Sequence, residues 1–137
     1  MHIYIAGKLR REAEQQQLEA IDALCKSLGH TTFLPHRDAG LCTTMDDVLA
    51  TFKKDIQEGM HSVNLIIACL DGLHVGAGTA WELGYAYAQG IPAVGLKTDE
   101  PVADALEYLS AILIGSMPIV TSLDELETWL QYHTKEK

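Results

Sequence analysis

Short apolar runs alternate with stretches of helical periodicity along the whole chain. Runs of this length predict buried strands, and apolar positions repeating every three or four residues predict helices that pack one face on a core. The run from 63 to 70 has Asn64 as its only polar residue, which is typical of a strand covered on both faces. The predicted strands are residues 3–6, 31–34, 63–70, 93–96 and 119–120. The predicted helices are one that ends at Gly29 and has its apolar face within 18–28, then 44–60, 78–90, 102–113 and one that begins near 123.

This strict alternation of strand and helix predicts an α/β fold. In so short a chain it favours a doubly wound sheet of five parallel strands in flavodoxin-like (Rossmann-like) order, with helices on both faces forming a three-layer sandwich. The 137 residues are close to the usual size of one domain, so we expect residues 1–137 to fold as a single domain. Ligands of such sheets bind beyond the carboxyl ends of the strands, which here are residues 7–11, 35–40 and 71–78.

Composition and charge narrow the function classes. With 10 Lys and Arg against 19 Asp and Glu, the net charge of -9 repels a polymeric nucleic acid but leaves a small anionic ligand open. The three cysteines show no CxxC pairing and the six histidines no ligand spacing, so we expect no disulfide framework, metal site or structural metal. No signal-peptide pattern opens the sequence and no apolar run reaches about eighteen residues, so we expect a soluble, cytoplasmic protein without a membrane partner.

Glu82 is the most informative residue of the sequence. It is the only charged residue between Thr79 and Ala88, and its helical neighbours offer it no polar face. A buried carboxylate without a partner is costly, and proteins usually accept that cost at functional sites. Near the start of a helix the dipole favours the ionised form, so we expect Glu82 to act as a base or nucleophile. The alternative is a partly exposed glutamate at a helix end.

A second carboxylate is available from Asp71 or Asp55. Asp71 ends the central predicted strand, and Asp55 lies on the preceding helix away from its apolar stripe. Cleavage of a glycosidic bond uses two carboxyl groups, one at the anomeric carbon and one assisting the leaving group. The alternatives are a turn residue in Asp-Gly for Asp71 and a solvated helix residue for Asp55.

Two features suit an anion. Gly76-Ala77-Gly78 precedes a predicted helix, whose first N–H groups can hold a phosphate, and Arg10, Arg11 and Arg37 follow the first two strands on the ligand edge. The arginines could also be ordinary surface charges. A dinucleotide fingerprint is absent because Trp81 stands where its third glycine belongs, and no GxxxxGK[ST] motif exists.

Four stretches of the sequence carry a family resemblance. They are Tyr4-Ile5-Ala6-Gly7, Asp55, Leu70-Asp71-Gly72, and the block Gly78-Thr79-Ala80-Trp81-Glu82-Leu83-Gly84-Tyr85-Ala86. With them the sequence resembles the nucleoside 2-deoxyribosyltransferase family over nearly its whole length. The resemblance implies that Glu82 is the nucleophile of a covalent glycosyl-enzyme, that Tyr4 orients Glu82, and that Asp55 binds the sugar or assists the leaving base. It also implies a homodimer or higher homo-oligomer, in which a neighbouring subunit completes the site.

A second branch of that family hydrolyses nucleoside 5'-monophosphates, and three short stretches are similar to it. Gly7-Lys8-Leu9-Arg10 resembles its first loop, whose arginine meets the 5'-phosphate; His36-Arg37-Asp38 resembles the cytidine monophosphate N-glycosidases. Leu109-Ser110-Ala111-Ile112 resembles a segment whose serine reaches the phosphate across a dimer interface. The transferases carry an acidic residue that contacts the base where this chain has Gly76.

These observations together predict an enzyme of nucleotide metabolism or salvage that needs no cofactor. It cleaves the N-glycosidic bond of a (deoxy)nucleoside or its 5'-monophosphate through a glycosyl-Glu82 intermediate and passes the deoxyribosyl group to another base. The first alternative is a nucleoside 5'-monophosphate N-glycosidase, which releases free base and sugar phosphate. The second is a nucleotide-binding sensor domain without catalysis. The predicted substrate-binding residues are Gly7, Arg10, His36, Arg37, Asp71, Gly76, Gly78 and Ser110.

Overall fold

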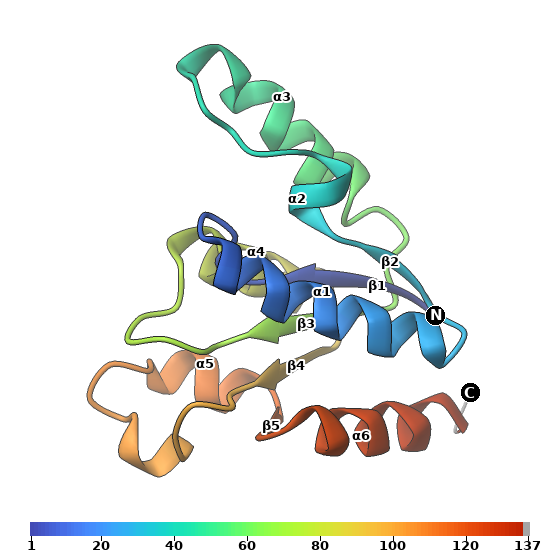
Figure 1. Ribbon diagram of the computed structural model, residues 1–137, viewed down its shortest axis with the longest axis vertical. Coiled ribbons are helices and arrows are strands. Elements are labelled where there is room, and N and C mark those ends of the chain that lie inside the picture. Colours follow the sequence, from blue (N-terminus) through green and yellow to red (C-terminus); the bar gives the residue numbers. More distant parts are fainter. Residues whose placement is uncertain (136–137) are drawn as a thin grey trace.

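A five-stranded parallel sheet forms the centre of the molecule, which a computed structural model describes for residues 1–135 (Figure 1). The strand order is β2-β1-β3-β4-β5, and every neighbouring pair is parallel. The predicted flavodoxin-like fold is therefore confirmed. The strands are β1 (His2–Ala6), β2 (Thr31–Phe33), β3 (Leu65–Cys69), β4 (Ala93–Leu96) and β5 (Ile119–Val120).

Helices cover both faces of the sheet. The α-helices are α1 (Glu12–Ser27), α2 (Pro35–Asp38), α3 (Val48–Phe52), α4 (Ala77–Ala88), α5 (Ala111–Ser116) and α6 (Leu123–Lys135). Three further turns complete them, the 3-10 helices η1 (Met45–Asp47) and η3 (Val102–Asp104) and the π-helix η2 (Lys53–Glu58). Helices α1 and α6 pack on one face, while η2, α4 and α5 pack on the other. No helix among residues 1–135 is both long and apolar enough to span a membrane.

Side chains of β1 alternate between the two faces of the sheet and so enter two different cores. Ile3 and Ile5 join the core beneath α1 and α6, whereas Tyr4 and Ala6 join the core on the α4 side. Successive residues of a strand point to opposite faces of the sheet, so this division follows directly from the geometry of the strand. Tyr4 is thereby completely buried on the face that carries α4.

The predicted helix over 102–113 is wrong. The structure has the short turn η3 there, then an irregular stretch, and only from Ala111 the helix α5. Ser110 is the N-cap of α5, and its Oγ accepts a hydrogen bond from the N–H of Ile112. Serine at this position favours a helix start over a helix interior, because its side chain competes for the backbone N–H groups.

The apolar stripe predicted over 44–60 is buried only at its end. Ile56 and Met60 enter the core, but Met45 and Leu49 are 84% and 75% exposed. The segment formed by η1 and α3 projects away from the sheet (Figure 1). Its helical periodicity is real, yet no core residue within 1–135 packs on its outer half.

Candidate active site

Two adjoining cavities open at the carboxyl edge of the sheet, as predicted for this fold. Their volumes are about 380 and 580 Å³. Five residues line both of them, so the cavities form one continuous cleft with two halves. The shared residues are Cys42, Thr51, Asp55, Gly78 and Glu82.

Glu82 lies at the junction of the two halves. It projects from α4, mostly buried, and a Cβ added at Gly78 would lie 3.8 Å from its Oε1. The other oxygen, Oε2, is closed to solvent and has no hydrogen-bond partner within residues 1–135. The absence of a side chain at Gly78 keeps the space beside the carboxylate open, which leaves it free to meet a ligand.

Tyr4 supports Glu82 from the sheet below. Burial, together with the nearby charges of Glu82 and Asp55, raises the pKa of the Tyr4 hydroxyl far above its usual value, so the group stays protonated. Its proximity lowers the pKa of the Glu82 carboxyl, against the larger raising effect of burial. The Tyr4 hydroxyl and Glu82 Oε2 both lack a hydrogen-bond partner within residues 1–135.

Asp55 enters the cleft from the π-helical turn η2. π-turns are rare and are frequent at functional sites. This one packs against Gly59 so closely that a Cβ there would lie 2.6 Å from the Asp55 carbonyl oxygen and 2.7 Å from the Phe33 ring. Asp55 Oδ1 is likewise buried without a partner in the described residues. Two side chains of different elements thus bring unpaired carboxylate oxygens to one cleft.

Burial sets the protonation of this pair. It raises the pKa of Glu82 to about 7, with a further contribution from the charge of Asp55, and it raises the pKa of Asp55 to about 6. The helix dipole, expected to favour ionised Glu82, is weak here because Glu82 is the sixth residue of α4 and the field falls off within the first turn. Both carboxyls therefore change charge near neutral pH, which suits groups that exchange protons or attack a substrate.

The smaller half of the cleft is apolar. Val48, Phe52, Ile56 and Trp81 supply its walls. The rings of Phe52 and Trp81 meet edge to face with centroids 5.8 Å apart, and Trp81 stacks on Tyr85 at 5.6 Å. Flat aromatic walls of this kind suit a planar, weakly polar group such as a nucleobase.

The larger half is basic. Lys8, Arg10 and Arg11 line it together with the start of α4 at residues 76–79. Arg10 Nη1 donates a hydrogen bond to the Cys42 carbonyl at 2.9 Å, which places its guanidinium over the cleft. Three cations facing a helix N-terminus make this half suited to an anion, although Glu14 also lies on its wall.

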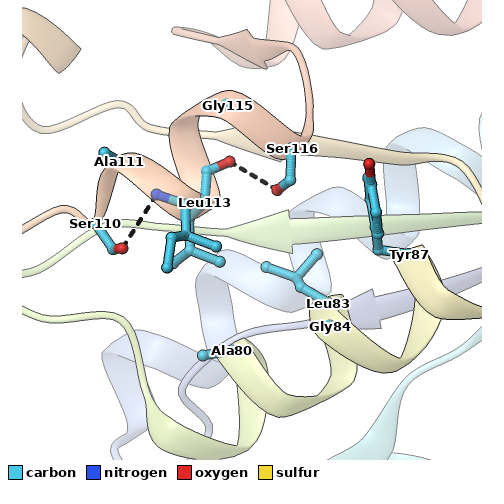
Figure 2. A pocket seen from close by; sticks show the side chains of 10 residues that line it. Ala80, Leu83, Gly84, Tyr87, Ser110, Ala111, Leu113, Gly115 and Ser116 are labelled. Atoms are coloured by element: carbon cyan, nitrogen blue, oxygen red, sulfur yellow. Dashed lines mark hydrogen bonds between the residues drawn. The ribbon is translucent and has the colours of Figure 1, made fainter.

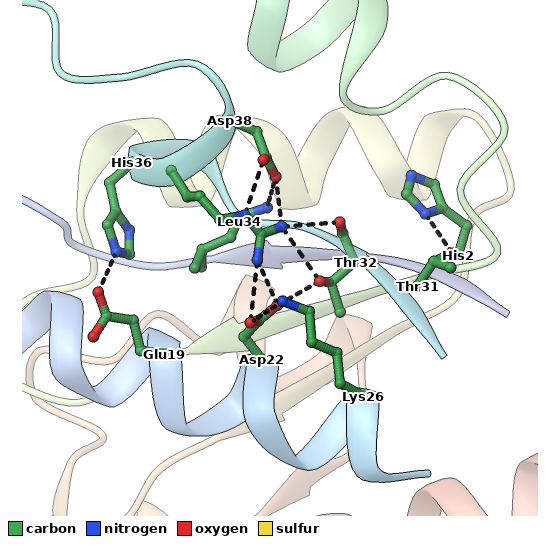
Figure 3. A network of polar contacts seen from close by, with 10 residues as sticks. His2, Glu19, Asp22, Lys26, Thr31, Thr32, Leu34, His36 and Asp38 are labelled. Atoms are coloured by element: carbon green, nitrogen blue, oxygen red, sulfur yellow. Dashed lines mark hydrogen bonds and ion pairs between the residues drawn. The ribbon is translucent and has the colours of Figure 1, made fainter. Parts of the chain in front are cut away.

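Arg37 and His36 lie in a separate polar network (Figure 3). Arg37 donates to both oxygens of Asp22 at 3.1 Å and to Asp38 Oδ2 at 2.7 Å, so its guanidinium is occupied by protein carboxylates. His36 Nε2 is 3.1 Å from Glu19 Oε1. The structure places both outside the two halves of the cleft. The network ties α1 to β2 and α2.

Asp71 and Ser110 also lie elsewhere. Asp71 accepts hydrogen bonds from the N–H of Thr98 at 2.6 Å and from Gln17 Nε2 at 3.0 Å. Ser110 lines a third cavity of about 620 Å³ between α4 and α5, where Leu83 and Tyr87 face it (Figure 2). Of the predicted binding residues, Gly7, Arg10, Gly76 and Gly78 thus line the cleft with Glu82 and Asp55, while Asp71 and Ser110 do not.

Several cleft residues were not singled out by the sequence. Lys8 follows the first strand beside Arg10, so its position in the ligand-edge loop was a usable signal. Cys42 and Thr51 carried no such signal, because only the path of the 40–52 segment brings them to the cleft. Among residues 1–135 no group of three or more His, Cys, Asp or Glu side chains converges in a way that could hold a metal ion.

Comparisons with known proteins identify the family of this chain. The family model described as nucleoside 2-deoxyribosyltransferase matches residues 3–119. A conserved protein from Enterococcus faecalis V583 has a similar structure, with 26% identity, coverage of 97% of this chain and 98% of that one, and a TM-score of 0.70. No curated protein matches the sequence.

Two further solved structures share the fold. A 2-deoxyribosyltransferase from Bacillus psychrosaccharolyticus has 22% identity, covers 93% of this chain and 90% of its own, and has a TM-score of 0.76. The CMP N-glycosidase BcmB from Clostridium botulinum has 18% identity, coverage of 96% and 99%, and a TM-score of 0.58. The match of the family model over most of the sequence decides the assignment: this chain belongs to the nucleoside 2-deoxyribosyltransferase family and is an enzyme that processes N-glycosidic bonds.

Proposed function

We propose that this protein transfers a deoxyribosyl group between nucleobases, with Glu82 as the nucleophile. The observation that carries the proposal is the position of Glu82, a mostly buried carboxyl with a free oxygen and a pKa of about 7, at the junction of an apolar and a basic cavity. A deoxynucleoside joins a planar base to a polar sugar, so it would lie across this junction.

The first step forms a covalent glycosyl-enzyme. An oxygen of ionised Glu82 attacks the anomeric carbon, the bond from that carbon to the base nitrogen breaks with its electron pair leaving on the base, and the base then takes up a proton. In the second step another base, through its own nitrogen, displaces Glu82 and loses a proton. Two displacements at one carbon give net retention of configuration.

Asp55 and Tyr4 take supporting roles in this proposal. Asp55 lines both halves of the cleft beside Glu82, where it can bind the sugar or assist the leaving base. Tyr4 keeps its proton and so can donate a hydrogen bond to the ionised form of Glu82. Such a bond would favour the ionised, nucleophilic form of Glu82, and Tyr4 would keep its own proton.

Product analysis tests the proposal directly. The protein is incubated with a panel of deoxynucleosides, with and without a free acceptor base, and the products are separated by chromatography. Transfer predicts a new nucleoside only in the presence of the acceptor. Glu82→Gln, a neutral variant of nearly the same shape, serves as control and should form none. A wild-type protein that forms no new nucleoside from any deoxynucleoside in the presence of the acceptor would contradict the proposal.

A second candidate is hydrolysis of a nucleoside 5'-monophosphate. The basic half of the cleft favours it, because Lys8, Arg10 and Arg11 beside the start of α4 are suited to a 5'-phosphate. Gly76 stands where the transferases of the family carry an acidic residue, so this position adds no negative charge to the basic half. In this case water, rather than a second base, resolves the glycosyl-enzyme.

We further propose that the enzyme works as a homodimer or higher homo-oligomer. The groove between α4 and α5 is lined mostly by apolar groups, and Figure 2 shows Leu83 and Tyr87 among them. Two of its lining residues are strongly exposed, Ile112 at 81% and Tyr87 at 72%. An apolar surface of this kind usually marks an interface. Ser110 in the same groove could then approach a neighbour's cleft. Sedimentation showing only monomers at micromolar concentration would contradict this idea.

A further inference from the structure

Lys97 is a lysine buried in the interior. It follows β4, and only 1% of its side chain is exposed. Lysine almost never occurs fully buried without a partner, because taking an ammonium group out of water is energetically unfavourable. Its Nζ lies 2.8 Å from Asp99 Oδ1, 3.5 Å from the Leu70 carbonyl oxygen and 3.8 Å from Glu100 Oε1. Lys97 is thus bonded both to its own loop and to the end of β3.

Asp99 links this contact to the loop that follows β3. Its second oxygen, Oδ2, accepts a hydrogen bond from the N–H of Gly72 at 2.8 Å. Gly72 has φ +98°, a conformation that other residues rarely adopt, so the bond stabilises a turn that only glycine makes easily. One step earlier, Asp71 accepts from the N–H of Thr98. We name the contacts among Leu70–Gly72 and Lys97–Asp99 the β3–β4 clamp.

The clamp lies at the root of the segment that leads to α4. Residues 71–76 connect the end of β3 to the first turn of α4, and Gly76 is the N-cap of that helix. Lys8 of the basic half packs on the same segment: a Cβ at Gly72 would lie 2.9 Å from Lys8 Nζ, and one at Gly76 3.4 Å from Lys8 Cγ. A shift of this segment would therefore move Lys8 and the start of the helix that carries Glu82.

We propose that Lys97 and Asp99 are positioning residues, which hold the start of α4 and Lys8 in the geometry that catalysis requires. This proposal rests on the function proposed above. Neither residue lines the cleft halves formed by the described residues, so their effect passes through Gly72 and the 71–76 segment. Displacements of about 1 Å at a reacting group can lower a rate about a hundredfold, so a modest loosening is measurable.

Two variants at Asp99 separate the parts of the clamp. Asp99→Ala removes the acceptor of the Gly72 N–H and the nearer carboxylate partner of Lys97, and leaves Glu100 as its second partner. Asp99→Asn keeps an oxygen for Gly72 but loses the charge. Asp99 is 39% exposed, so both variants should fold. Lys97→Met, which replaces the buried charge by an apolar side chain, is the third variant.

The control is Asp22→Asn. Asp22 is also a buried carboxylate paired with cations, Lys26 and Arg37, but it belongs to the network of α1, β2 and α2 outside the cleft. A purely structural role of the clamp predicts that all four variants lose stability and keep their kinetics. A positioning role predicts that only the clamp variants change kcat.

The readouts are kcat and KM for a nucleoside substrate and amide hydrogen exchange over residues 70–80. We expect Asp99→Ala and Lys97→Met to lower kcat at least tenfold and to change KM by less than threefold. The kcat of Asp99→Asn should lie between theirs and that of the wild type. The control Asp22→Asn should keep the wild-type kcat. Exchange over 70–80 should rise in Asp99→Ala and Lys97→Met and stay unchanged in the control. Wild-type kcat or unchanged exchange in both would overturn the proposal. If the wild type itself is inactive on every substrate, the proposed function fails. Amide hydrogen exchange over residues 70–80 then still tests whether Lys97 and Asp99 hold this segment.

Discussion

Replacing Glu82 by Gln should make the protein more stable, by an amount that depends on pH. Burial raises the pKa of Glu82 from its ordinary 4.5 to about 7 in the folded protein. The folded state therefore binds the proton more tightly than the unfolded chain, and folding stability falls as pH rises through this window. Glutamine has nearly the same shape and carries no charge, so it avoids this cost.

The magnitude follows from the two pKa values. Each factor of ten in the ionisation equilibrium corresponds to about 1.4 kcal/mol, so the full difference is about 3 kcal/mol above pH 7. Below pH 4.5 both states are protonated and the difference vanishes. In a domain of this size about 3 kcal/mol corresponds to roughly 10 °C in Tm. Chemical denaturation of wild type and Glu82→Gln at pH 4, 6 and 8 measures the change.

A control with the opposite sign is available in the same chain. Partial burial of Asp22 raises its pKa, but bonds from Lys26, Thr32 and Arg37 outweigh that effect and hold the pKa below its usual range. The carboxylate therefore stabilises the fold above the pKa of the unfolded chain and loses this contribution as pH falls. Asp22→Asn should destabilise the protein most near neutral pH. If Glu82→Gln gave no gain in stability at pH 8, or an equal gain at pH 4 and pH 8, a buried Glu82 carboxyl with a raised pKa would be refuted.

Three further predictions concern activity. Glu82→Ala should abolish cleavage while far-UV circular dichroism stays native, and turnover near the wild-type rate would remove Glu82 as nucleophile. The value of kcat/KM should rise with pH and level off above about 7, as Glu82 loses its proton; a profile flat between pH 5 and 8 would contradict this. If the basic half binds a 5'-phosphate, a monophosphate should bind at least about tenfold better than its nucleoside, because one charge-assisted bond contributes about 1.5 to 3 kcal/mol. Arg10→Ala should erase much of that preference and Arg37→Ala should retain it at lower stability, whereas equal binding of both ligands by the wild type would exclude the phosphate contact.

Local patterns in the sequence were enough to predict the fold and the central residue of the cleft. The order of strands and helices follows from local periodicity, and the parallel sheet places the loops after β1 and β3 on one edge whatever the side chains do in detail. The isolation of Glu82 among small and apolar residues is likewise a local feature of α4. Because these properties depend on neighbours in the chain, they could be predicted without coordinates.

Tertiary structure decided which charged groups are free and how they titrate. Arg10 and Arg37 are equivalent in sequence terms, but Asp22 and Asp38 occupy Arg37 while Arg10 reaches the cleft. Asp55 and Asp71 were also equal candidates in the sequence. Asp55 lines the cleft, whereas hydrogen bonds from Thr98 and Gln17 hold Asp71 outside it. The pKa of Glu82 depends on burial by β1, η2 and α4 together. These outcomes depend on contacts between segments far apart in the chain, and local sequence patterns do not predict such contacts.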